Sequence, residues 1–219
     1  MIYDQKKLII FDLDGTLIDS MNVWREVDTK FFAKRNMPFP EDLFDNMQSN
    51  NITGMAVHFK NRFSLTETAE EIVSEWLREV DYAYNNNINL KPGAYELLNL
   101  FKEKNIKLAV GTSNERGLTN AVLKRHNILD YFDSIVCGCD CENGKPAPDI
   151  FLKIASNLNT NSKECLVIED SLLGVRAAKN AGMSVLAVAD DQSKRDRKDI
   201  IKEADGFIES LFDVLDYQG

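Results

Sequence analysis

Short apolar runs separated by longer amphipathic stretches make up most of this chain. From residue 91 onward, apolar positions recur every three or four residues in one segment and then run continuously in the next, which predicts alternating helices and strands. The continuous runs lie at residues 8–11, 107–110, 134–137, 165–168 and 184–188, and residues 206–208 are expected to form a last edge strand. Strands separated by helices predict a parallel sheet with right-handed crossovers.

The stretch between the first two strands shows helical periodicity alone. Its first helix would present Val23, Trp24, Val27, Phe31 and Phe32 on one face, and its last would present Ala69, Ile72, Val73, Trp76, Leu77, Val80 and Tyr84. Ser64 and Glu67 have the spacing of a capping box that would begin this last helix, whereas residues 49–54 read as a loop. We therefore expect an all-α insertion at residues 18–88. Residues 1–17 and 89–219 would then form the α/β core, a Rossmann-like parallel sheet.

Near the end of the chain, residues 190–202 mix charges of both signs, and we expect a solvated helix there.

The composition narrows the partners. The 219 residues are 44% hydrophobic and carry a formal charge of −9, so the chain can bury a core but lacks the basic surface that nucleic acids require. A local site can still bind a small phosphorylated substrate. The sequence shows no signal sequence and no apolar run of about 20 residues, so we expect a cytoplasmic protein that does not bind membranes. We also expect a monomer or weak oligomer.

The four cysteines are best interpreted as reduced thiols. Cys137, Cys139 and Cys141 form a C-x-C-x-C pattern, and Cys165 stands apart. A structural zinc site is the weaker alternative, because four-ligand sites normally use C-x₂₋₄-C pairs.

The first strand is followed directly by Asp12-Leu13-Asp14-Gly15-Thr16. Alternate residues of an extended segment point in opposite directions, so the two aspartates should not use their side chains in the same way. An ordinary turn is one alternative interpretation. A calcium-binding loop fails on spacing, because it needs Gly at the sixth position and Glu at the twelfth, where this chain has Leu17 and Val23.

Two later strands also end in polar residues. Thr112, Ser113 and Asn114 follow one strand, and Glu169 and Asp170 end another. In a parallel sheet these groups would meet Asp12 and Asp14 at one edge, where crowded carboxylates raise one another's pKa unless a cation lies among them. Oxygen ligands of this kind suit Mg²⁺. Lys145, in the loop Gly144-Lys145-Pro146-Ala147-Pro148-Asp149, would add a positive charge that holds a nucleophile or a phosphate.

Together these motifs resemble the haloacid dehalogenase superfamily. The resemblance rests on D-x-D-G-T after a strand, a later strand ending in Thr, the G-K-P-x-P-D loop and E-D-S-x-x-G, in this order. Most members of that superfamily are Mg²⁺-dependent phosphatases. The helical insertion matches in position and length the small cap of the subgroup that contains β-phosphoglucomutase.

The resemblance implies a role for each motif residue. Asp12 would be the nucleophile that forms an aspartyl-phosphate, and Asp14 would be the general acid and base while its main-chain carbonyl binds Mg²⁺. Thr112, with the backbone amide of Ser113 or Asn114, would bind the phosphoryl group. Lys145 would pair with Asp12 and the phosphate. Asp12 and Asp170 would bind the metal directly, and Glu169 directly or through water. An aspartate at position 14 points to phosphate esters rather than to the dehalogenase branch.

The cap would select the substrate. Its candidate lining residues are Met21, Trp24, Ser49, Asn50, Asn51 and His58, although Trp24 also fits a helix core, His58 an ordinary polar position and residues 49–51 a turn. The glycine-flanked cap arginine typical of the mutases is missing, and Lys60 and Arg62 are possible substitutes.

We therefore predict a Mg²⁺-dependent phosphatase acting on a small phosphorylated metabolite, such as a sugar phosphate. A phosphosugar mutase is the first alternative. A non-catalytic phosphate-binding or phospho-receiver module is the second.

Overall fold

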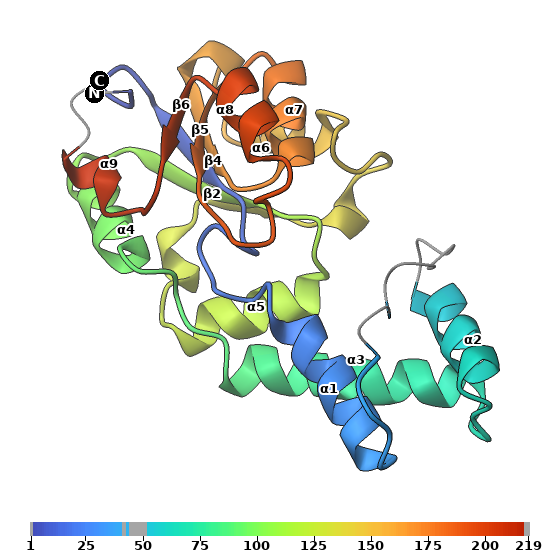
Figure 1. The fold of residues 1–219 in the computed structure, drawn as a ribbon. Helices are drawn as coiled ribbons and strands as arrows, with labels where there is room; N and C mark the ends of the chain where they lie inside the picture. Colours follow the sequence, from blue (N-terminus) through green and yellow to red (C-terminus); the bar gives the residue numbers. More distant parts are fainter. Residues whose placement is uncertain (1, 41–42, 44–51, 217–219) are drawn as a thin grey trace. The chain divides into compact units, whose positions relative to one another are not determined.

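A computed structural model describes residues 2–40, 43 and 52–216 of the chain. Within these ranges, six parallel strands form one sheet in the order β3-β2-β1-β4-β5-β6 (Figure 1). The strands are β1 (Leu8–Phe11), β2 (Lys107–Gly111), β3 (Ser134–Val136), β4 (Cys165–Glu169), β5 (Ser184–Val188) and β6 (Gly206–Ile208). The predicted α/β class with a parallel sheet is confirmed, and β6 is the edge strand that the sequence suggested.

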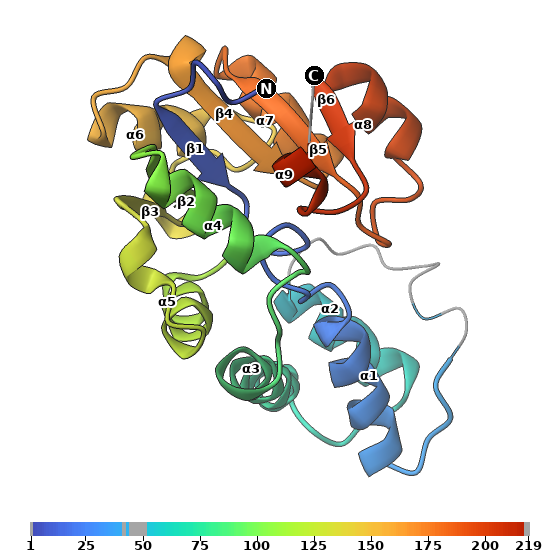
Figure 2. The ribbon, with the colours of Figure 1, turned by 90° about the vertical axis from the view of Figure 1, so that its left-hand side faces the viewer.

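Both faces of the sheet are covered by helices, and Figures 1 and 2 show α4 and α7 on opposite sides. Along the chain, the first of these helices are α4 (Ala94–Glu103), α5 (Arg116–Arg125) and α6 (Asp149–Asn157). The later ones are α7 (Leu172–Asn180), α8 (Arg197–Glu203) and α9 (Asp213–Asp216). Short 3₁₀ turns lie at Leu129–Tyr131, Gly138–Asp140 and Ser162–Glu164. Because helices cover both faces of the sheet, β1 and β4 are buried at every position, and all of their residues except Glu169 are apolar.

The chain divides into two compact units, one formed by residues 1–21 and 88–219 and the other by residues 22–87. We call the first the core unit and the second the helical unit. The helical unit contains α1 (Val23–Lys34), α2 (Ile52–Arg62) and α3 (Ala69–Asn86). Buried aromatic side chains pack its interior, with the rings of Phe59 and Trp76 in edge contact at 4.8 Å between centroids. None of the described helices is both long and apolar enough to cross a membrane.

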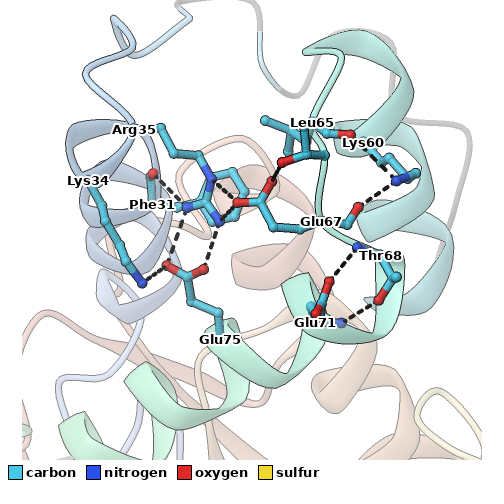
Figure 3. Close-up of polar contacts among 10 residues, drawn as sticks. Phe31, Lys34, Arg35, Lys60, Leu65, Glu67, Thr68, Glu71 and Glu75 are labelled. Atoms are coloured by element: carbon cyan, nitrogen blue, oxygen red, sulfur yellow. Dashed lines mark hydrogen bonds and ion pairs between the residues drawn. The ribbon is translucent and has the colours of Figure 1, made fainter.

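A polar network joins the ends of the three helices in the helical unit (Figure 3). Arg35 Nη2 donates to Glu67 Oε1 and to Glu75 Oε2, both at 2.8 Å, and the guanidinium lies 3.6 Å from the centre of the Phe31 ring. Lys60 Nζ donates to the backbone oxygen of Glu67 at 2.5 Å. The segment between α2 and α3 is therefore attached to both of its neighbours.

Several predictions about individual helices were wrong. The capping box of α3 is Thr68 with Glu71, and Ser64 instead has a φ of 51°. Residues 52–54, expected in a loop, begin α2. In the segment 190–202 the helix begins only at Arg197.

Two apolar side chains assigned to buried helix faces are exposed. Trp24 and Leu77 are 44% and 47% exposed. Helical spacing defines a face, but it does not say how far around the helix the contact extends.

Candidate active site

The loop after β1 is a tight turn that packs against the end of β4. The backbone amides of Leu17 and Ile18 both donate to the Leu13 oxygen, and Gly15 adopts a φ of 83°. A side chain at Gly15 would place its Cβ only 2.5 Å from Asp170 Oδ2, so both the backbone angle and the close approach require glycine. Since β1 pairs with β2 and with β4, the loops that follow all three strands come together at one edge.

Lys145 lies between two carboxylates. Its Nζ donates to Asp12 Oδ1 at 2.5 Å and to Glu169 Oε1 at 2.7 Å, and the Lys145 side chain is only 7% exposed. Burial alone would lower the pKa of Lys145, but the two carboxylates outweigh it and hold that pKa above its usual range. Burial raises the pKa of Asp12 to about 7, although the ammonium acts to lower it.

Both carboxylate oxygens of Glu169 accept hydrogen bonds within the protein. One of its carboxylate oxygens accepts from Lys145, and the other accepts from the backbone amide and the hydroxyl of Ser171 at 2.6 Å and 2.9 Å. A Cβ on Gly174, in the first turn of α7, would lie 1.7 Å from Glu169 Oε1. The glycine of the E-D-S-x-x-G motif therefore makes room for the Glu169 carboxylate.

Asp170 is the other acidic group from the end of β4. Its Oδ1 accepts from the buried hydroxyl of Thr16 at 2.9 Å, and its Oδ2 lies 3.4 Å from the hydroxyl of Ser193. Burial, together with the charges of Glu169 and Asp12, raises the pKa of Asp170 well above its ordinary value.

Asp14 is held by hydrogen bonds to both carboxylate oxygens. Ser20 Oγ donates to Oδ1 at 2.6 Å, and Asn114 Nδ2 donates to Oδ2 at 2.9 Å. The backbone amide of Asn114, which we had expected to help bind phosphate, donates instead to Thr112 Oγ1 at 3.0 Å. Sequence reasoning missed these uses of Ser20 and Asn114, and no spacing signal in the chain indicates them.

The core unit contains a cavity of about 230 Å³ at this edge. Most of the site residues expected in the core line this cavity: Asp12, Asp14, Thr112, Ser113, Lys145, Glu169 and Asp170. Met21, Ser171 and Leu173 complete the lining. The cavity therefore has four acidic side chains and one basic side chain on its walls.

Of the expected cap residues, Met21 belongs to the core unit and lines this cavity. Trp24 and His58 belong to the helical unit, and the buried Nε2 of His58 has no hydrogen-bond partner in the described part of the chain. Ser49, Asn50 and Asn51 lie outside the described residues.

The charge balance of the cavity fits a divalent cation. Four carboxylates face one ammonium, and burial disfavours the charged forms of Asp12 and Asp170 unless further positive charge is present. Among the described residues, no three His, Cys, Asp or Glu side chains are grouped to hold one ion. A site with few protein ligands suits Mg²⁺, because this ion is usually bound by one or two carboxylates while water and substrate oxygens complete its shell. The same observation gives no support to a zinc site at the cysteines, which carry no disulfide.

Known proteins resemble this chain in sequence and in fold. Residues 9–188 match the family model described as haloacid dehalogenase-like hydrolase, so the chain belongs to that family of enzymes. This confirms the resemblance noted in the sequence and removes the non-catalytic receiver module from consideration.

Several curated relatives are phosphatases by name. A phosphorylated carbohydrates phosphatase from Thermotoga maritima is 32% identical over 188 residues, covering 80% of this chain and 81% of that protein. (DL)-glycerol-3-phosphatase 2 from Arabidopsis thaliana is 32% identical over 213 residues, covering 94% of this chain and 87% of that protein. Among solved structures, a proposed β-phosphoglucomutase from Thermotoga maritima superposes with a TM-score of 0.83 at 27% identity, covering 96% of this chain and 98% of that one.

Proposed function

We propose that this protein is a Mg²⁺-dependent phosphomonoesterase that acts on a small phosphorylated carbohydrate through an aspartyl-phosphate on Asp12. The observation that carries the proposal is the buried contact of Asp12 with Lys145, beside Asp14 at the end of the central strand β1. Family membership and the names of the relatives support the reaction class and the kind of substrate.

The substrate phosphate would enter a cavity whose walls are mostly anionic. Lys145 and the Thr112 hydroxyl would bind its oxygens, and Asp12 would attack phosphorus with a carboxylate oxygen. Mg²⁺, held by Asp12, Asp170 and the Asp14 carbonyl, would offset the repulsion between the nucleophile and the phosphate. Glu169 would support Lys145 through Oε1 and bind the metal directly or through water.

Asp14 would serve as the acid and then as the base. It would protonate the oxygen of the departing alcohol and later accept a proton from the water that attacks the aspartyl-phosphate, which releases inorganic phosphate and restores Asp12. The two half-reactions thus use one carboxyl group in opposite protonation states.

The helical unit gives hydrolysis further support over a mutase reaction. A mutase acting on a sugar bisphosphate needs a second cationic group for the phosphate that does not react. Lys60, one possible substitute for that group, donates to the backbone oxygens of Leu65 and Glu67 and is therefore used within the helical unit (Figure 3).

The test compares Asp12→Asn with Asp130→Asn, which changes an exposed carboxylate in the 3₁₀ turn after α5. Hydrolysis of p-nitrophenyl phosphate should require Mg²⁺ and should fall by at least about 1,000-fold in Asp12→Asn, because the nucleophile is lost. Asp130→Asn should keep the wild-type rate. Wild-type activity in Asp12→Asn would exclude Asp12 as the nucleophile.

A further inference from the structure

Asp14 has different neighbours on its two carboxylate oxygens. Oδ1 accepts from the Ser20 hydroxyl, and the Ser20 residue is only 4% exposed. Oδ2 accepts from the side-chain amide of Asn114. A hydroxyl can donate or accept a hydrogen bond, whereas an amide NH₂ group can only donate. The two oxygens are therefore held by two different side chains.

The orientation of the Asn114 amide is set by its other contact. The backbone N–H of Glu115 donates to Asn114 Oδ1 at 2.7 Å. Because a backbone N–H can only donate, the atom facing it must be the amide oxygen, and Nδ2 must be the atom that faces Asp14. Oδ2 of Asp14 is consequently the acceptor of this hydrogen bond.

We propose that Asn114 and Ser20 are positioning residues that hold the Asp14 carboxyl group in the orientation from which it exchanges a proton with the reacting oxygen. The inference rests on the proposed function. Since the two residues hold opposite oxygens of the carboxyl group, Asp14 cannot rotate without losing at least one of these hydrogen bonds.

The proton balance then runs through the carboxyl group that these two residues hold. In the first half-reaction Asp12 forms a bond to phosphorus, the bond from phosphorus to the alcohol oxygen breaks, and the proton on Asp14 moves to that oxygen. In the second, water forms a bond to phosphorus, the bond to Asp12 breaks, and the proton from water returns to Asp14. Without Asn114 or Ser20 the carboxyl group could rotate, so part of the enzyme would hold it in an orientation that does not reach the reacting oxygen.

The reaction's dependence on the leaving group tests this role. An alkoxide must be protonated as it leaves, whereas p-nitrophenolate leaves readily without a proton. We would measure kcat/KM for ethyl phosphate and for p-nitrophenyl phosphate with Mg²⁺ in Asn114→Ala, Ser20→Ala and Ser20→Thr. Asn120→Ala, in helix α5 just after the loop that holds Asn114, is the matched control.

For ethyl phosphate, kcat/KM should fall by about 100-fold in Asn114→Ala and Ser20→Ala, because the general acid is no longer held in place. For p-nitrophenyl phosphate it should change by less than about threefold, since the first step needs little acid catalysis. In these two variants the release of nitrophenolate should show an initial burst, because hydrolysis of the aspartyl-phosphate still needs Asp14 as a base and becomes the slow step. Ser20→Thr, which keeps the hydroxyl, and Asn120→Ala should behave like the wild type.

An equal fall in kcat/KM for both substrates in Asn114→Ala would show a merely structural role and overturn the inference. So would wild-type values for both substrates. Absence of Mg²⁺-dependent hydrolysis in the wild-type protein would instead overturn the proposed function, so the two failures are distinguishable.

Discussion

The contact between Glu169 and the first turn of α7 can be tested with Gly174→Ala. A Cβ at this position would lie 1.7 Å from Glu169 Oε1 and 2.0 Å from Cδ, so either the Glu169 carboxylate or the start of the helix must move. Glu169 is completely buried and accepts hydrogen bonds from Lys145 and Ser171. A displaced carboxylate would therefore leave the Lys145 ammonium with one partner fewer.

The size of the effect follows from three contributions. Overpacking a buried site costs about 1–3 kcal/mol, and loss of one hydrogen bond to a charged group costs about 1.5–3 kcal/mol. Replacing glycine by alanine within a helix stabilises by about 1 kcal/mol. The free energy of unfolding of the core unit should therefore fall by about 2–5 kcal/mol in Gly174→Ala.

The matched control is Gly117→Ala in the first turn of α5, where an added Cβ meets nothing within 4 Å. This variant should be as stable as the wild type or more stable by up to about 1 kcal/mol. Urea unfolding followed by far-UV circular dichroism reports on both units of the protein. Both tryptophans, Trp24 and Trp76, lie in the helical unit, so tryptophan fluorescence gives a separate signal for that unit.

Equal unfolding midpoints for Gly174→Ala and Gly117→Ala would contradict the reasoning, because they would mean that Glu169 does not occupy the space beside Gly174. A loss of stability confined to the fluorescence signal would contradict it too, since the substitution lies in the core unit.

Three further changes should alter stability in stated directions. Burial raises the pKa of Asp28 from 3.8 to about 7, so the free energy of unfolding should fall as pH rises from about 4 to about 7. In urea titrations, Asp28→Asn should be more stable than the wild type by about 2–4 kcal/mol at pH 8 and equally stable at pH 4. Lys145→Gln leaves Asp12 and Glu169 without their shared cation, so thermal unfolding at pH 8 should show a loss of about 3–5 kcal/mol that shrinks at pH 5, where a carboxyl group can take up a proton. Arg35→Gln should cost about 1–2 kcal/mol by tryptophan fluorescence, and unchanged stability would mean that the network in Figure 3 contributes nothing.

The strands could be predicted from the sequence, but their order in the sheet could not. Apolar runs such as residues 8–11 and 165–168 report burial on both faces, and burial is a local property. Pairing of β1 with β4 depends on how segments far apart in the chain meet, and neither apolar run indicates which strand it pairs with.

The same limit explains the misplaced capping box. Ser64 with Glu67 and Thr68 with Glu71 both have the required spacing, only four residues apart. The capping box forms from Thr68 and Glu71, because the Glu67 carboxylate accepts a hydrogen bond from Arg35, the C-cap residue of α1. A contact made across the helical unit decided between two equal local signals.

At the site, the sequence indicated the groups and the contact of Lys145 with Asp12, but not their other partners. Strand ends and family motifs indicated Asp12, Asp14, Lys145 and Asp170, and the structure brings all four to one cavity. The hydrogen bonds of Glu169 to Lys145 and to Ser171 depend on side-chain directions, which residue spacing does not specify.

The central place of β1 in the sheet also has a consequence for how the protein is made. β1 is the first strand to leave the ribosome, yet its neighbours begin at residues 107 and 165, with the whole helical unit emerging before either of them. The contacts of α1, α2 and α3 are near one another in the chain, so this unit can fold early, whereas β1 must wait first for β2 and then for β4. We therefore expect a slow step in refolding when the two halves of the sheet close around β1. The loop that carries Asp12 and Asp14 would be among the last parts of the core unit to take its final form.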